Sequence, residues 1–402
     1  MKRNIEIILI YATGLMQGLV LVTVPAASSV FTDPHSFGFS ASQYGALFIP
    51  QVIMSIIAAL VAPKISSRIG SKIVYQAGLA FNCLAAALVA LSQYFIGHPM
   101  AYICVMLSTS AVGAAFGTTL PMINVYAQRF FPKNSAGALT GLHSLLGTGT
   151  ALAPLLVVVF VKQFGWWILP VLALVVMTVI FIASFLLPLD VHVIPEKAGP
   201  HTGHSQELGI QNGKMGGIFW LFIAIIFCYG YCETLFGNWA IIYLKNEKAI
   251  PAIEASYALS VFWVMVTVGR LLTAFLSAWI APRWIYRALP VLIMISLWAV
   301  TTVHSGMMGI LFFGLAGLAC SAFFPLSFSF AQGRFASAAE KVSGSLMASY
   351  MLGYGFASYG IGRIVQDTGF PLGSLYRFSI AVPLLMIFLV FFLTLVKPSV
   401  SR

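Results

Sequence analysis

The sequence predicts an all-α membrane protein whose twelve membrane-spanning helices form two six-helix, pseudo-symmetric halves. Two features of the composition predict a membrane protein: 60% of the residues are hydrophobic, and only 8% are charged. So few charges cannot cover the surface of a soluble chain of 402 residues. The third feature is the repeated alternation of long apolar runs with short polar turns, which predicts helices because a helix pairs its backbone groups internally.

The predicted helices follow the apolar runs in chain order. A spanning helix needs about 20 predominantly apolar residues, and glycine, proline or charged residues separate the runs of this length. Only Ser305 and Gly306 separate the ninth helix from the tenth, so we expect a very tight turn there. The helices are predicted near 5–31, 42–62, 73–95, 101–124, 138–161, 166–187, 217–244, 256–280, 288–304, 306–330, 342–366 and 373–396.

The positions of the basic residues predict the topology. A net charge of +11 would suggest a nucleic-acid partner in a soluble protein, but most of the 21 basic residues fall on one side of the predicted bilayer. By the positive-inside rule this side is the cytoplasm, so we expect both termini there, a cytoplasmic (inner) membrane and no nucleic-acid partner. The residues on this side are Lys2, Arg3, Lys64, Arg68, Lys72, Arg129, Lys133, Lys197, Lys214, Arg283, Arg287, Arg334, Lys341, Lys397 and Arg402.

A polar stretch rich in proline and glycine, residues 188–216, divides the chain, with six predicted helices on each side. The sequence therefore predicts an N-terminal bundle (1–187), a cytoplasmic linker (188–216) and a C-terminal bundle (217–402). Each half carries a turn of alanine, proline and a basic residue, at 62–64 and 281–283, and an arginine lies four residues beyond the basic residue in both. This repeat indicates a duplicated six-helix unit.

The loop after the second helix carries a motif that, together with the two halves and their linker, resembles the major facilitator superfamily over the whole chain. The signature of that loop is Gly, three residues, Asp, Arg, any residue, Gly, Arg, and Arg or Lys. This sequence keeps Arg68, Gly70 and Lys72, and it departs at Pro63, Ser67 and Ser71. The resemblance implies the major facilitator fold and a gating role for the three kept residues. The repeat adds Arg287 to the predicted gate.

The seventh helix resembles the fucose-permease-like branch of the superfamily. The similar residues are Tyr229-Gly230, Glu233, Gly237, Trp239 and Tyr243-Leu244, with Gly269-Arg270 and Phe324-Pro325 in later helices. Residues 101–124 lack the acidic residue that such sugar permeases carry in the fourth helix. The antiporter signature of the fifth helix is incomplete, because Ala153 precedes Pro154 where that signature has glycine. This pattern favours import or facilitation over multidrug efflux.

Two ionisable residues inside predicted helices are candidates for proton coupling. A charge at mid-membrane costs at least about 2.5 kcal/mol, so Glu233 indicates a functional site. The alternative is that Glu233 is permanently hydrogen-bonded and fixes helix packing. His143 in the fifth helix is the second candidate, and its alternative is a hydrogen-bonded core histidine.

The remaining candidates concern the substrate. Arg270 either receives an anionic substrate or holds a helix end and the cytoplasmic gate, and Trp263 shares its helical face. Tyr229 lies one turn from the glutamate of the seventh helix. Gln17 and Asn124 either contact a polar solute or form hydrogen bonds between helices.

These residues predict a monomeric secondary transporter that moves a small solute by alternating access, with proton-coupled import as the first hypothesis. The alternatives are proton-driven efflux of a drug, siderophore or metabolite and, in different classes, an intramembrane enzyme with His143 or Glu233 as base or a non-transporting sensor. The sequence contains no GxxxxGK[ST], HExxH or GxSxG motif, so we expect no cofactor, no metal site and no enzymatic activity. Protons and membrane lipid are the expected partners besides the solute.

Overall fold

The structure is a computed structural model that describes residues 2–189, 210–211, 214–335 and 338–395. Within this part of the chain, eleven segments are helical, long and apolar enough to cross a membrane. A further helical segment, 339–368, runs beside them, and its serine, glycine and tyrosine residues make it more polar. Together these segments confirm the predicted all-α fold with twelve membrane-spanning helices.

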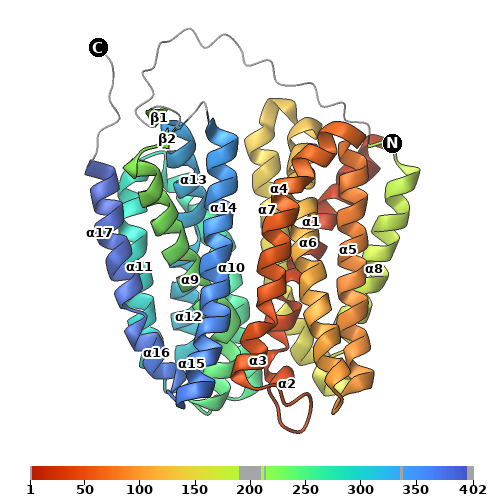
Figure 1. Cartoon of the computed structure of the whole chain (residues 1–402), viewed down its shortest axis with the longest axis vertical. Coiled ribbons are helices and arrows are strands. Elements are labelled where there is room, and N and C mark those ends of the chain that lie inside the picture. Colours follow the sequence, from red (N-terminus) through yellow and green to blue (C-terminus); the bar gives the residue numbers. More distant parts are fainter. Residues whose placement is uncertain (1, 190–209, 212–213, 336–337, 396–402) are drawn as a thin grey trace.

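The helices before the predicted linker form one bundle, drawn in red to yellow-green in Figure 1. Its α-helices are α1 (Lys2–Ala26), α2 (Ser28–Phe31), α3 (Ala41–Ala46), α4 (Phe48–Ile69), α5 (Ser71–Leu91), α6 (Pro99–Phe130), α7 (Ser135–Gln163) and α8 (Ile168–Leu186). Two short 3₁₀ turns, η1 (Ser92–Phe95) and η2 (Pro132–Asn134), follow α5 and α6.

The later helices form the second bundle, drawn in green to blue. A short antiparallel pair of strands, β1 (Ile210–Gln211) and β2 (Lys214–Met215), precedes it. The α-helices are α9 (Gly217–Asn246), α10 (Ala252–Leu276), α11 (Pro282–Thr301), α12 (Gly306–Cys320), α13 (Phe323–Arg334), α14 (Ala339–Gly355), α15 (Ile361–Thr368), α16 (Leu372–Phe378) and α17 (Ala381–Leu395). A π-helical turn, η4 (Phe356–Gly360), joins α14 to α15.

Two predicted helix ends next to prolines are wrong. The second helix was predicted to end at residue 62, but α4 continues through Pro63 to Ile69. The fourth was predicted to end at 124, but α6 continues past Pro121 to Phe130. A proline removes one backbone donor, and a helix packed against neighbouring helices tolerates that loss.

The predicted tenth helix, 306–330, is interrupted, which corrects the expectation of one continuous helix. The α-helical hydrogen-bonding pattern is interrupted at Ser321 and Ala322, between α12 and α13, although both residues keep right-handed backbone angles, and α13 then continues to Arg334. Pro325 explains part of this break: it has no N–H group, so the carbonyl of Ser321 lacks the donor that an unbroken helix would supply. The break lies beside the candidate site.

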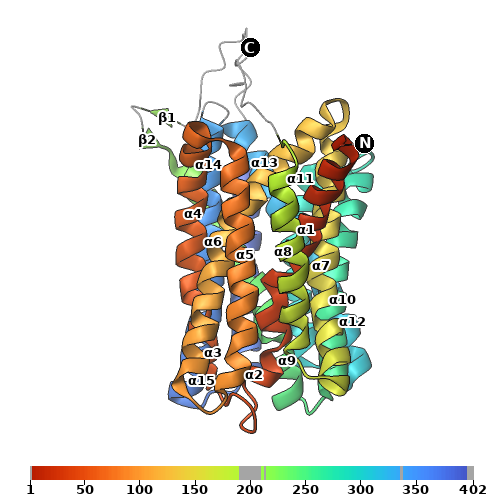
Figure 2. The ribbon, with the colours of Figure 1, turned by 90° about the vertical axis from the view of Figure 1, so that its right-hand side faces the viewer.

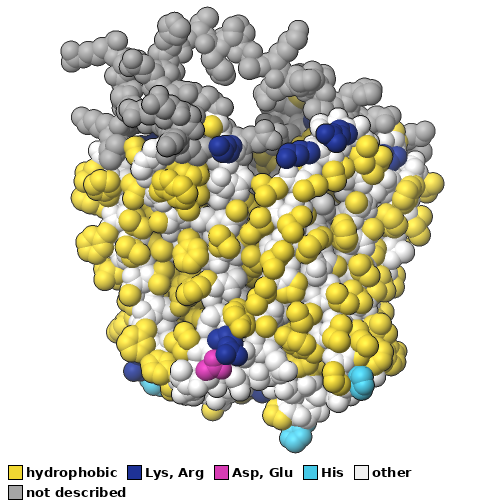
Figure 3. Space-filling model, in the orientation of Figure 1, with side chains coloured by type: hydrophobic (Ala, Val, Ile, Leu, Met, Phe, Trp, Pro, Cys, Tyr) yellow, Lys and Arg dark blue, Asp and Glu magenta, His cyan; other side chains and the backbone are white. Residues whose placement is uncertain are grey.

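The two ends of the molecule differ in charge. We call the end where α1 begins and α17 stops the terminal end, and the opposite end the far end (Figures 1 and 2). Dark blue Lys and Arg side chains lie along the terminal end in Figure 3. The described basic residues at the helix termini there are Arg3, Lys64, Arg68, Lys72, Arg129, Arg283, Arg287, Arg334 and Lys341. That this end faces the cytoplasm stays a prediction, and most of the predicted linker, 188–216, lies outside the described residues.

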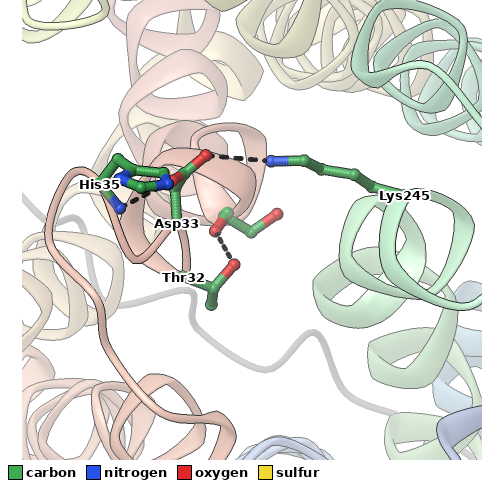
Figure 4. A network of polar contacts seen from close by, with 5 residues as sticks. Thr32, Asp33, His35 and Lys245 are labelled. Atoms are coloured by element: carbon green, nitrogen blue, oxygen red, sulfur yellow. Dashed lines mark hydrogen bonds and ion pairs between the residues drawn. The ribbon is translucent and has the colours of Figure 1, made fainter. Parts of the chain in front are cut away.

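Polar contacts join the two bundles at the far end. Lys245 Nζ of α9 lies 3.3 Å from Asp33 Oδ2 in the loop after α2 (Figure 4). The backbone N–H of His35 donates a 2.9 Å hydrogen bond to Asp33 Oδ1, and this bond and Lys245 hold the pKa of Asp33 below its ordinary value. Tyr44 Oη donates a 3.0 Å hydrogen bond to the carbonyl oxygen of Asn238. The bundles are therefore closed against each other at this end.

Two glycines extend this contact to the backbone. A Cβ atom at Gly45 of α3 would lie 2.3 Å from the carbonyl oxygen of Ser358 in η4. A Cβ atom at Gly362 of α15 would lie 2.3 Å from the carbonyl oxygen of Ala41 in α3. Only glycine permits helices to approach this closely. We call these backbone contacts and the polar contacts above the far-end interface.

Candidate functional site

A cavity of about 490 Å³ lies between the two bundles. Residues of α1, α6 and α7 line one side, and residues of α9, α10, α13 and α14 line the other. Thr140 near the start of α7 and Ser277 just after α10 place one part of the wall toward the terminal end. Since the far-end interface closes the other end, the cavity faces the terminal end.

Glu233 of α9 is the acidic residue of this cavity wall, and the residue is 6% exposed. Its two carboxyl oxygens have separate partners. Tyr229 Oη donates to Oε1 at 2.9 Å, because the two residues lie one turn apart on α9. Tyr350 Oη of α14 donates to Oε2 at 2.6 Å. Two tyrosine hydroxyls therefore compensate for the loss of water around the buried carboxyl.

Arg270 of α10 also lines the cavity, and it is bound to the break in the tenth helix. Its Nε donates a 3.1 Å hydrogen bond to the carbonyl oxygen of Ser321. This carbonyl has no helical donor, because the residue four positions later is Pro325. Among the described residues, the ion pairs within 4.0 Å are Lys245–Asp33 and Arg363–Asp367, so Glu233 is not in one. The cavity thus carries a carboxyl and a guanidinium group that do not neutralise each other by direct contact.

Two more predicted residues reach the cavity. His143 faces it from α7, in the opposite bundle from Glu233. Trp263 faces it from α10, and its Nε1 is buried without a hydrogen-bond partner among the described residues. The accessible area of this atom is under 1 Å², so in this conformation Trp263 offers the cavity aromatic surface and not its N–H group. Of the predicted binding and coupling residues, the structure brings Tyr229, Glu233, Trp263, Arg270 and His143 to one cavity.

Gln17 and Asn124 do not line this cavity. Gln17 is fully buried in the first bundle, where its Oε1 accepts a 2.8 Å hydrogen bond from Asn82 Nδ2. This contact agrees with hydrogen bonding between helices, one of the two alternatives for Gln17. The Oδ1 atom of Asn124 is buried and has no partner within the described residues. A role of either side chain in binding stays a prediction.

The predicted gating residues lie at the terminal ends of α4, α5 and α11. Arg68 is exposed, and Gly70 connects α4 to α5 with a φ of 97°, which favours glycine. Lys72 Nζ donates to the carbonyl oxygen of Leu187 at 2.7 Å. Arg287 Nε donates to Thr394 Oγ1 at 2.7 Å. Lys72 and Arg287 therefore contact residues of their own bundles, and a gating role stays a prediction.

Tyr350 and the break in the tenth helix were not predicted from the sequence. Tyr350 is uncharged, so the search for charged residues inside apolar runs did not select it. Its position in the most polar of the twelve segments could have made it a candidate. Pro325 is the sequence feature nearest the break, but a proline does not suffice to predict one, because α4 and α6 continue through Pro63 and Pro121. Within the described part of the chain, no group of three or more His, Cys, Asp or Glu residues is placed to hold a metal ion.

Comparison with known proteins is consistent with this geometry. The family model of the Major Facilitator Superfamily matches residues 7–358. The glucose/mannose transporter GlcP of Bacillus subtilis (strain 168) is 25% identical over 293 residues, which cover 71% of this chain and 71% of that protein. The nucleoside transporter NupG superposes with a TM-score of 0.71 at 14% identity, over 97% of this chain and 99% of that chain. FucP in the outward conformation superposes with a TM-score of 0.62 at 16% identity, over 98% of both chains. At these identities the solved structures show a shared fold.

Proposed function

Because the chain belongs to the Major Facilitator Superfamily, a family of secondary transporters, we propose that it imports a small uncharged polyhydroxylated solute together with a proton. The bundles 1–187 and 217–402 move about the central cavity, and the terminal end faces the cytoplasm of an inner membrane. In this interpretation the closed far end and the cavity toward the terminal end correspond to an inward-facing state.

The observation that carries the proton-coupling proposal is the setting of Glu233. Its carboxyl is buried in the cavity wall and held by two tyrosine hydroxyls, with no cation within 4.0 Å among the described residues. A tyrosine hydroxyl donates to a carboxylate and also accepts from a carboxylic acid. Glu233 can therefore change its protonation state without losing its partners, whereas an ion pair would keep it charged.

The solute class rests on the cavity and on the solutes for which similar proteins are named. A volume of about 490 Å³ lies in the range of small-molecule sites. The side chains of Trp263, Phe324 and Tyr350 supply aromatic surface to the cavity wall. The formal charges of one carboxylate and one guanidinium group in the cavity wall cancel, which favours an uncharged solute. GlcP is named for glucose and mannose and NupG for nucleosides, so hexoses and nucleosides are the first solutes to test.

The test is uptake by purified protein in proteoliposomes, with radiolabelled glucose, mannose, fucose and uridine and an inward proton gradient. Glu233→Gln resembles the protonated acid and adds no bulk. It should abolish accumulation above the external concentration but retain exchange of internal for external solute. Exchange needs the site to reorient and needs no proton release.

Glu6→Gln is the matched control. Glu6 is also 6% exposed in a helix, but it accepts a hydrogen bond from the backbone of Leu189 and does not line the cavity. This variant should accumulate solute like the parent. Undiminished accumulation by Glu233→Gln would remove Glu233 from the coupling mechanism and leave His143 as the next candidate. Transport of none of the four solutes would reject the proposed solute class.

A further inference from the structure

The hydroxyl group of Tyr229 lies between two acceptors. It is 2.9 Å from Glu233 Oε1 and 3.0 Å from the carbonyl oxygen of Cys320, the last residue of α12. A tyrosine hydroxyl carries one hydrogen, so it can donate fully to one of these atoms at a time. When Glu233 is ionised, its carboxylate and the Cys320 carbonyl are both acceptors, so one of the two does not receive the full hydrogen bond from Tyr229.

The ionised carboxylate is the stronger competitor, because hydrogen bonds to charged groups are roughly twice as strong as neutral ones. Tyr229 then donates to Glu233, and the Cys320 carbonyl loses this donor. When Oε1 is protonated, the acid donates its new hydrogen to the Tyr229 oxygen. Tyr229 keeps its own hydrogen and donates it to Cys320, while Tyr350 donates to Oε2 in both states. Each donor and acceptor in this series of hydrogen bonds, from Tyr350 through Glu233 and Tyr229 to Cys320, then has a partner.

The Cys320 carbonyl lies at the break between α12 and α13. It is among the last four carbonyl groups of α12, which have no partner within their own helix. The next carbonyl, that of Ser321, is bound by Arg270. The ring of Tyr229 also stacks on Phe323, the first residue of α13, at 5.3 Å between ring centres. The contacts of Tyr229 therefore reach both sides of the break.

The segment after the break forms part of the cavity wall. Phe324, Pro325 and Leu326 line the cavity, and α13 continues from them to the terminal end. A hydrogen bond from Tyr229 to the Cys320 carbonyl fixes the end of α12 to α9, and only two residues separate this end from the start of α13. Its gain or loss therefore changes how firmly the start of α13 is positioned.

We propose that Tyr229 relays the protonation state of Glu233 to the α12–α13 break and so couples the proton site to the part of the cavity wall that α13 forms. This inference rests on the proposed role of Glu233 in proton coupling. Protonation of Glu233 frees the Tyr229 hydrogen for Cys320 and holds α13; loss of the proton withdraws that hydrogen and loosens α13.

Several other titratable or charged groups surround Glu233. Tyr350 and Tyr354 face it from α14, Arg270 from α10 and Cys320 from α12. Cys232 is its neighbour on α9, and His143 faces the same cavity from α7. Of the two tyrosines that donate to Glu233, Tyr229 alone also has a hydrogen bond to the α12–α13 break in the described structure. Tyr350 is therefore the matched control.

The test is hydrogen–deuterium exchange of the full-length protein in nanodiscs, followed on peptides that cover residues 318–330. Measurements are made at several pH values between 5 and 9 and corrected for the intrinsic pH dependence of exchange. In the parent, we expect exchange at the break to be about fivefold slower in the acidic range, the change that one net hydrogen bond produces. Glu233→Gln should keep the slow exchange at every pH.

Tyr229→Phe retains the stacked ring and removes the hydroxyl. It should abolish the pH-dependent change at the break, whereas Tyr350→Phe should move its midpoint and keep its amplitude. A parent-like pH profile in Tyr229→Phe, with Glu233→Gln insensitive to pH, would overturn the relay and leave the proton site intact. A persistent pH response in Glu233→Gln would overturn both the relay and the proposed titration of Glu233. No pH response in the parent would also overturn the relay.

Discussion

A single methyl group at Gly362 should open the far end of the molecule. Its Cβ would lie 2.3 Å from the carbonyl oxygen of Ala41, whereas ordinary contacts begin near 3.4 Å, so α3 and α15 must separate by about 1 Å. Overpacking of this kind costs typically about 1–3 kcal/mol. Since this contact joins the two bundles, Gly362→Ala should lower the ratio of far-end-closed to far-end-open molecules about 5- to 150-fold.

The ratio of far-end-closed to far-end-open molecules can be measured by pulsed electron–electron double resonance between spin labels on the two bundles. Cysteines replacing His98 and Ala252, both exposed near the far-end starts of α6 and α10, report the separation there. The five native cysteines are first replaced by serine. Gly362→Ala should add or enlarge a longer-distance population.

Gly360→Ala is the matched control, because it lies two residues away and its Cβ would meet nothing within 4 Å. Both changes add the same methyl group to helical backbone, so they share any effect on helix propensity. Gly360→Ala should therefore keep the parent distance distribution. If Gly362→Ala gives that same distribution, the backbone contact does not hold the far end closed.

Three further variants test individual side-chain contacts. Asp33→Asn should weaken far-end closure by at most about 1 kcal/mol, because the pair with Lys245 is partly exposed. The pKa of Asp33 lies below its ordinary value of 3.8. The ion pair is therefore present above pH 3.8 and is lost only as the pH falls through the lowered pKa. The change in the spin-label distances caused by Asp33→Asn should accordingly be the same at pH 5.5 and 7.5. Trp263→Phe reduces the aromatic surface of the cavity wall, so it should weaken solute binding about 2- to 10-fold in a thermal-shift titration, and unchanged affinity would show that the indole does not contact the solute. Arg270→Lys lacks the planar guanidinium that reaches Ser321, so its melting temperature should fall, and parent-like melting would show that the break needs no such contact.

The local sequence was sufficient to identify the spanning helices and several cavity residues. Apolar runs of membrane length indicate helices whatever their neighbours, because lipid leaves the backbone no other partner. Glu233, Arg270 and His143 could be selected in the same way, since a charged or titratable residue inside such a run is costly and therefore informative. The prediction worked for these residues because its physical basis is a property of one helix and its solvent.

The sequence could not separate Gln17 from the cavity residues. It is polar and lies in a spanning helix, as Trp263 does, but its partner Asn82 is 65 positions away along the chain. Only the packing of α1 against α5 brings Gln17 to Asn82 and places it outside the lining of the central cavity. Similarly, the exchange of the Tyr229 hydrogen between Glu233 and Cys320 depends on the approach of α9 to the end of α12.

By itself, then, the sequence determined that this chain is a membrane protein of twelve helices with an acid buried in the seventh, because hydrophobic length and charge cost are local quantities. The tertiary structure decided which tyrosines hold that acid, that Arg270 binds a broken helix and not the acid, and that Gly45 and Gly362 join the bundles. These contacts join residues far apart in the chain, and their formation depends on distances of a few ångströms that only the packed helices fix.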